Sequence, residues 1–293
     1  MMGRAFAPGH ITGFFEIRDV PKDPLKKGSR GVGVNLSLGV LSTVEAEPAG
    51  RSNIEILLNG KAVEARTTKK AVALILGTRK MKIKVDSRVE LPIGQGLGMS
   101  AAGALSTALA LSKAIGRSHS FLKAGEAAHC AEVMERTGLG DVAGQTRGGW
   151  EMRVRSGFPP HGFVDRILAP ASEMVICVSG EPVLTKAVLS DPVKRKAITN
   201  AGRKCMNEFL LDPNLENFFR LSREFAGRTA LASDCSLALV DKIRSMGLGM
   251  AGVSMIGNSV FAIGDVHKLK MLMGRHGEVF CCSVDIQGAR LVA

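Results

Sequence analysis

Three glycines at alternate positions, Gly94, Gly96 and Gly98, are the strongest chemical signal in the sequence. They lie just before a run of small and apolar residues, Met99 to Ile115, that predicts a helix ending at Gly116. Alternating glycines let successive backbone N–H groups converge on one anion, and the first turn of a helix adds free N–H donors and the positive end of its dipole. The segment therefore predicts a phosphate site.

Ser100 falls at the start of this helix, where its hydroxyl could reach a magnesium ion carried by the phosphates. The small residues after it keep the first turn slim, so that a ligand can approach closely. The alternative is an ordinary glycine-rich turn with a serine cap. We expect these residues to bind the nucleotide: Pro92, Gly94, Gly96, Leu97, Gly98, Met99, Ser100, Ala101 and Ala102.

Other phosphate-binding patterns are missing from the sequence or lie in the wrong context. It contains no G-x-x-x-x-G-K-[ST] segment and neither H-R-D nor D-F-G, which argues against a P-loop enzyme and a protein kinase. A G-x-G-x-x-G pattern does occur at Gly247, Gly249 and Gly252. It follows a predicted helix and precedes a predicted strand, which is the reverse of the dinucleotide-binding order.

A carboxylate on the next predicted helix, residues 121–137, could complete a magnesium site. Mg²⁺ takes one or two protein oxygens and fills its remaining positions with water and phosphate. We select Glu132 as this ligand, with Glu135 as its main rival. Glu126 lies six residues earlier, well under two helical turns, and would face elsewhere. A solvent-facing helical glutamate is the alternative reading of Glu132.

Asp141 follows Gly138-Leu-Gly in a predicted turn after this helix. A carboxylate there could accept the proton of an attacking hydroxyl or orient that hydroxyl. Asp141 could instead only stabilise the turn, because aspartate is common in turns for its local hydrogen bonds.

A negatively charged acceptor would need a cation, and the planar fork of arginine matches a carboxylate best. Arg147, Arg153 and Arg155 follow Asp141 closely, and on a strand over residues 150–155 the last two share one face. We favour Arg153. His10 could hydrogen-bond a substrate hydroxyl at neutral pH, or it could serve packing alone.

The elements around these residues divide into two parts. Residues 5–89 read as strands and turns, with alternating apolar and polar side chains, a hairpin turn at Asn59-Gly60 and a helix over residues 68–77. A break at residues 158–162 precedes one strand, three helices and a strand–helix–strand segment. The pattern predicts an α+β protein with a domain over 1–165 and a second over 166–293.

The composition is that of a globular protein: 293 residues, of which 45% are hydrophobic and 23% charged. The net charge of +12 suits anionic small ligands or nucleic acid, but aromatic residues make up only 4% and do not interleave with basic ones. The N-terminus lacks a secretory pattern and no apolar run is long enough to cross a membrane, so we expect a cytoplasmic protein. Six cysteines without C-x-x-C spacing suggest reduced, mostly buried thiols.

The segment PIGQGLGMSAA resembles the P-x-x-x-G-L-G-S-S-A motif of the GHMP kinases, with Met99 in place of the first serine and Ser100 as the second. Residues 7–13 resemble the N-terminal motif of the family, with His10 where lysine is usual. Glu132 and residues 138–142 resemble its metal-binding glutamate and catalytic aspartate. Residues 254–262 resemble its C-terminal glycine-rich motif but keep only Gly257 of the usual glycines, which puts a phosphate contact there in doubt.

This resemblance implies a two-domain fold, with an N-terminal domain of the ribosomal protein S5 domain 2-like type and a ferredoxin-like C-terminal domain. It also implies ATP and Mg²⁺ as cofactors, Ser100 and Glu132 as metal ligands, and Asp141 as the catalytic residue.

Residues 8–15, residues 23–36 and the glycine-rich loop are similar to the archaeal pantoate kinases in particular. That subfamily implies ATP-dependent phosphorylation of pantoate to 4-phosphopantoate in coenzyme A biosynthesis. We then expect His10, Ser29 and Arg153 to bind the substrate. The partners would be the small molecules ATP and pantoate, with neither nucleic acid nor membrane, and a homodimer is compatible with the sequence.

Two alternatives remain. Another GHMP-type kinase could use a mevalonate-, homoserine- or shikimate-like alcohol. A basic RNA-binding protein could reuse a similar N-terminal fold, and it would bind RNA in a salt-sensitive way without turning over ATP.

Overall fold

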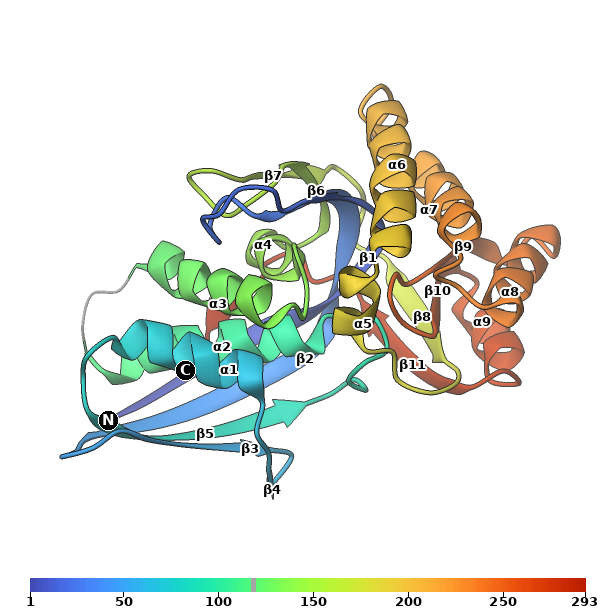
Figure 1. Ribbon diagram of the computed structural model, residues 1–293. Helices are drawn as coiled ribbons and strands as arrows, with labels where there is room; N and C mark the ends of the chain where they lie inside the picture. The colour runs from blue at the N-terminus through green and yellow to red at the C-terminus, as the bar shows by residue number, and fades with distance from the viewer. Residues whose placement is uncertain (117–119) are drawn as a thin grey trace.

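A computed structural model describes residues 1–116 and 120–293, and the chain forms two sheets with helices packed on them (Figure 1). The first sheet has the order β12-β1-β2-β5-β3-β4, with β6 pairing with β2 and β7 with β6. Its strands are β1 (Met2–Arg18), β2 (Gly28–Pro48), β3 (Asn53–Leu58), β4 (Lys61–Ala62), β5 (Met81–Val89), β6 (Trp150–Arg155), β7 (Phe163–Ile167) and β12 (Arg290–Leu291).

The long hairpin of β1 and β2 is the centre of this sheet. One end of β2 pairs with β5, and its opposite end pairs with β6. The turn predicted at Asn59-Gly60 joins β3 to β4, with positive φ angles of 48° and 78° at its two residues. These are the angles that a two-residue hairpin turn of type I′ requires.

Helices α1 (Arg66–Leu76), α2 (Met99–Ala114) and α3 (Phe121–Glu135) lie together, with α2 packed against β1 and β2 (Figure 1). The short α4 (Asp141–Arg147) follows them. In α2, 14 of the 16 residues are buried. A helix that is apolar or small all round is surrounded by protein on every side. The glycine-rich loop that precedes α2 is thereby fixed to the centre of the molecule.

The second sheet is antiparallel, with the order β11-β8-β10-β9. Its strands are β8 (Glu173–Val178), β9 (Gly249–Val253), β10 (Ser259–Gly264) and β11 (Glu278–Ser283), and its helices are α5 (Thr185–Ser190), α6 (Pro192–Phe209), α7 (Leu215–Thr229), α8 (Asp234–Ser245) and α9 (Val266–Met273). The order strand, helices, two strands, helix, strand is that of a ferredoxin-like domain. The predicted α+β class and two-domain architecture are confirmed.

Aromatic rings join the two parts of the chain. Phe14 of β1 packs on Phe209 of α6 with ring centroids 5.6 Å apart, and Trp150 of β6 packs on Phe218 of α7 at 5.3 Å. A domain boundary near residue 165 stays a prediction. Residue 165 itself lies within β7, and the chain returns to the first sheet through β12.

Several local predictions were wrong. The helix predicted over 121–137 ends at Glu135, because Arg136 adopts a left-handed φ of 57°. Asp141 begins α4 instead of lying in a turn. The short elements α4, α5, β7, β9 and β12 were not predicted. Only Cys177 and Cys205 of the six free cysteines are buried, whereas most were expected to be.

Among the described residues, no helix is both long and apolar enough to cross a membrane.

Candidate active site

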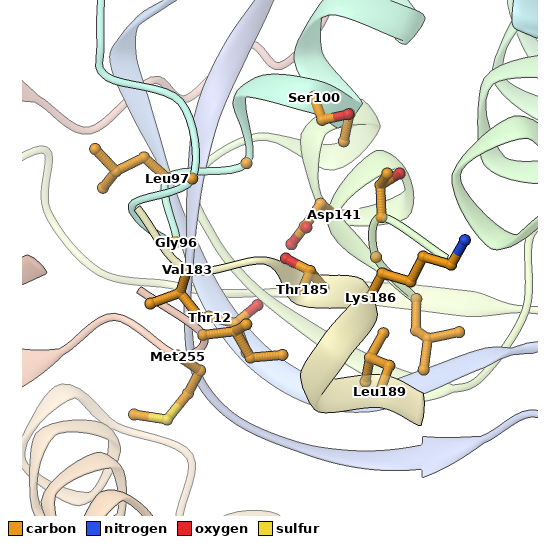
Figure 2. A pocket seen from close by; sticks show the side chains of 18 of the residues that line it. Thr12, Gly96, Leu97, Ser100, Asp141, Val183, Thr185, Lys186, Leu189 and Met255 are labelled. Carbon is orange, nitrogen blue, oxygen red and sulfur yellow. The ribbon is translucent and has the colours of Figure 1, made fainter. Parts of the chain in front are cut away.

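A cavity of about 650 Å³ lies between the two parts of the chain. Its walls come from the glycine-rich loop and the start of α2, from residues 137–141, from β1, β2 and β6, and from α5 and the loop before it. Figure 2 shows Ser100, Asp141, Thr185 and Lys186 placed around this hollow. The glycine-rich loop and Asp141, the expected catalytic aspartate, therefore line one cavity.

The glycine-rich loop has the backbone that its glycines predict. Gly94, Gly96 and Gly98 have φ angles of 80°, 74° and 67°, in the left-handed region that favours glycine. No side chain of the described residues caps α2, and its first turn contains no acidic residue, so its N-terminal N–H groups suit an anion. Of the nine residues expected to bind nucleotide, Pro92 and Ala102 do not line the cavity, and the other seven do.

The C-terminal segment supports this loop from the second part of the chain. The Ser254 hydroxyl donates a hydrogen bond to the Gly96 carbonyl, and the Ser259 hydroxyl donates to the Gln95 carbonyl at 2.7 Å. A Cβ atom on Gly257 would lie 2.1 Å from the Gln95 carbonyl carbon, so only glycine fits there. Gly257, the one glycine that residues 254–262 keep of the family motif, is therefore needed for close packing against the glycine-rich loop.

Ser100 begins a row of hydroxyl groups. Its Oγ donates to Thr67 Oγ1 at 3.3 Å, and Thr67 Oγ1 lies 3.1 Å from Thr137 Oγ1. The Thr137 N–H donates to the Glu132 carbonyl at 3.1 Å. We did not predict Thr137, which lines the cavity, or Thr67, which contacts Ser100, because no local sequence pattern marks either threonine.

Glu132 is completely buried and lies beside Asp141. A Cβ atom on Gly138 would lie 2.3 Å from Glu132 Oε1 and 3.0 Å from Asp141 Oδ2, so the two carboxylates flank the space that Gly138 leaves empty. Nearby backbone N–H groups of Asp141 and Val142 favour the ionised form of Glu132. Neither carboxylate oxygen of Glu132, however, has a well-formed hydrogen bond to the described residues.

Burial, and then the negative charge of Asp141, raise the pKa of Glu132 well above its ordinary value. A cation between the two carboxylates would relieve both effects, so these residues fit a bound Mg²⁺. Glu126, which was expected to face elsewhere, pairs with Lys123 at 2.7 Å. Neither Glu132 nor its rival Glu135 lines the cavity, but Glu132 lies against Gly138, which does.

His10 is buried between two carboxylates. Its Nδ1 lies 2.9 Å from Asp141 Oδ1 and its Nε2 lies 2.9 Å from Glu151 Oε1. A neutral imidazole has one N–H, so only the imidazolium can donate to both oxygens. Burial lowers the pKa of His10, but the hydrogen bonds that His10 donates to Asp141 and Glu151 outweigh it, and the pKa is raised. Glu151 was missed, although it lies two residues from Arg153 and so on the same strand face.

Asp141 has 27% of its side chain exposed. Burial opposes its ionised form, but the hydrogen bond and charge of His10 lower its pKa. Asp141 is therefore a carboxylate at neutral pH, held by His10 on one oxygen and open toward the cavity on its other side.

Arg153 is the arginine of the three candidates that lines the cavity, although it is only 2% exposed. A bulge between Arg153 and Arg155 breaks the register of β6 with β7, so the prediction that the two share a face was wrong. Arg155 is exposed and donates to the Pro160 carbonyl at 3.4 Å, and Arg147 is also exposed. Ser29 lines the cavity beside Arg153, and both pack against Gly140.

Comparisons with known proteins agree with this geometry. The family model "GHMP kinases N terminal domain" matches residues 62–149. A pantoate kinase of Thermococcus kodakarensis is 36% identical over 269 residues, which cover 90% of this chain and 88% of that protein. A pantoate kinase of Methanocaldococcus jannaschii is 34% identical over 263 residues, covering 88% and 91%.

Solved structures of kinases and phosphotransferases are also similar to this chain. A "Phosphotransferase related to CoA biosynthesis pathway" has a TM-score of 0.89 at 32% identity and covers 100% of this chain and 99% of that one. A homoserine kinase from Cytophaga hutchinsonii has a TM-score of 0.70 at 17% identity, covering 99% and 97%, and shows a likeness of fold. The chain therefore belongs to the GHMP kinase family, together with the archaeal pantoate kinases that it matches over most of its length.

Proposed function

We propose that this protein transfers the γ-phosphoryl group of ATP to the primary hydroxyl at C4 of pantoate, forming 4-phosphopantoate for coenzyme A biosynthesis. The observation that carries the proposal is one cavity that holds the uncapped N-terminus of α2, the Asp141 carboxylate and the Arg153 guanidinium. Phosphoryl transfer to an acid that bears an alcohol needs these three functions: an anion site, an acceptor for the hydroxyl proton and a cation for the carboxylate. The names of the relatives support pantoate as that acid.

On the nucleotide side, the glycine-rich loop and the N–H groups of α2 would hold the triphosphate. Ser100 and Glu132 would hold Mg²⁺, which neutralises phosphate charge when it is bound. Ser254 and Ser259 donate hydrogen bonds to this loop and Gly257 packs closely against it, so the loop is held in place. A rigid anion site costs no reorganisation during the transfer.

On the acceptor side, Asp141 would accept the proton of the pantoate hydroxyl, or orient that hydroxyl for attack. Arg153 lines the cavity, and its guanidinium would bind the substrate carboxylate. Ser29, on the same part of the wall, would add a hydroxyl. His10 would act through Asp141, because both of its ring nitrogens already face carboxylates.

Glu132→Gln is expected to lower turnover and at the same time stabilise the protein that holds no nucleotide or metal. Losing one group that stabilises transition-state charge should lower kcat by roughly 10²-fold. The folded state holds the Glu132 proton more tightly than the unfolded chain, so this contribution to stability is lost as pH rises through the raised pKa. Glutamine cannot ionise, so the melting temperature of the variant should exceed that of the wild type by a margin that grows from acid to neutral pH.

Thermal melting without ligands and kcat at saturating Mg²⁺ check both halves of this expectation. Glu135→Gln is the matched control and should change neither quantity much. A Glu132→Gln variant that keeps wild-type turnover would remove Glu132 from the metal site.

A coupled ADP-release assay with pantoate, mevalonate, homoserine and shikimate tests the proposed substrate. We expect ADP release that depends on pantoate and Mg²⁺, and much slower release with the other three. Faster turnover of another alcohol would keep the kinase and change the acceptor. Salt-sensitive RNA binding without ADP release would favour the RNA-binding alternative.

A further inference from the structure

Four charged side chains form a continuous chain across the acceptor side of the cavity. Asp141 contacts His10, His10 contacts Glu151, and Glu151 Oε1 accepts a short hydrogen bond from Arg153. Asp141 and Arg153, at its two ends, line the cavity, whereas His10 and Glu151, in the middle, have no exposed surface. The two groups assigned to the acceptor are thus joined through a buried glutamate that does not itself reach the cavity.

The fold leaves room for the centre of this chain. A Cβ atom on Gly33 of β2 would lie 2.6 Å from His10 Nε2 and 2.8 Å from Glu151 Oε1. A Cβ atom on Gly144 of α4 would lie 2.6 Å and 3.1 Å from the same two atoms. Glycines from two different elements therefore flank one hydrogen bond, and any larger residue at either position would push its partners apart.

The charges of the chain alternate, and Glu151 separates the two cations. Arg153 Nη1 lies only 3.4 Å from His10 Nε2, and Glu151 Oε1 contacts both. Without the glutamate charge, an imidazolium and a guanidinium would face each other in a buried site, which is strongly unfavourable. Either His10 would lose its proton and its hold on Asp141, or the Arg153 fork would turn away.

We propose that Glu151 is a positioning residue for the transfer proposed above, on which this inference rests. Glu151 holds His10 and Arg153 side by side and so fixes the distance between the Asp141 carboxylate and the cation that receives the substrate carboxylate. The C4 hydroxyl and the carboxylate of pantoate lie at opposite ends of one small molecule. Their two receptors must therefore keep a set distance for the hydroxyl to be aligned with the phosphate.

Glu151→Gln tests this role, because it keeps the shape of the side chain and removes its charge. We expect kcat to fall and the pantoate KM to rise, each by roughly 10- to 100-fold, the loss that accompanies a charge-assisted hydrogen bond. The ATP KM should stay within about twofold, since the nucleotide side of the cavity does not contact this residue. A purely structural role would lower only the amount or melting temperature of folded protein.

Glu16→Gln is the matched control. Glu16 is equally buried on β1 and is held by Arg18, Arg30 and Arg203 at 2.9 to 3.2 Å, but none of these partners lines the cavity. It should lower stability and leave kcat and both KM values unchanged.

Glu151→Asp keeps the buried charge, so it provides the same test if the glutamine variant does not fold. Its shorter side chain should give the same pattern at smaller size. Wild-type kinetics in either Glu151 variant would overturn the positioning role. Absence of pantoate-dependent ADP release in the wild-type protein would instead refute the proposed function itself.

Discussion

Asp141→Asn is expected to lower kcat by roughly 10² to 10⁴-fold while ATP still binds, the range that general-base help contributes. The His10 imidazolium donates to Asp141 Oδ1, so an asparagine would turn its amide oxygen to His10 and its NH₂ group toward the acceptor. An NH₂ group can only donate a hydrogen bond, so the hydroxyl proton would have no acceptor. The attacking oxygen belongs to a primary alcohol of very high pKa, which cannot be free alkoxide at neutral pH.

Steady-state kinetics together with a nucleotide-binding measurement check this result. ATP affinity should change little, because the glycine-rich loop and α2 do not depend on the Asp141 charge. If Asp141→Asn keeps most of its turnover, Asp141 is not the base. Positioning and the metal would then have to account for the rate.

Arg153→Lys is expected to raise the pantoate KM by roughly 10- to 100-fold, the value of a hydrogen bond to a charged group, and to leave the ATP KM nearly unchanged. Lysine keeps the positive charge that Glu151 needs, so the variant should fold. The lysine side chain lacks the planar fork with which arginine matches a carboxylate.

Arg155→Ala is the matched control, because Arg155 lies two residues away on the same strand but is exposed and outside the cavity. It should keep wild-type kinetics. A rise in the ATP KM instead of the pantoate KM in Arg153→Lys would assign Arg153 to the nucleotide and leave the substrate carboxylate without its cation.

The geometry of the glycine-rich loop, which we assign to the nucleotide, could be predicted from the sequence because its parts are contiguous. Gly94, Gly96 and Gly98 precede a helix of small residues, and the local backbone geometry follows from those residue types alone. Their support by Ser254 and Ser259 could not be predicted, because it depends on how the second sheet packs against the first.

The acceptor side was predicted only in part, because its contacts cross large distances in sequence. His10 and Glu151 are 141 residues apart and meet only when β1 and β6 join β2 on either side. The sequence placed Arg153 and Arg155 on one face, and a bulge that depends on pairing with β7 separates them. Asp141 was assigned to a turn, because seven residues that include a glycine give too weak a helix signal for α4.

The most direct test of the central claim is to identify the product by phosphorus NMR after incubation of the purified protein with ATP, Mg²⁺ and pantoate. We predict one new phosphate monoester resonance, coupled to the protons of the adjacent CH₂ group and equal in amount to the ADP formed. Its absence with Asp141→Asn on the same time scale would tie the product to this cavity. Inorganic phosphate as the only product, or no ADP at all, would contradict the assignment of this site to pantoate phosphorylation.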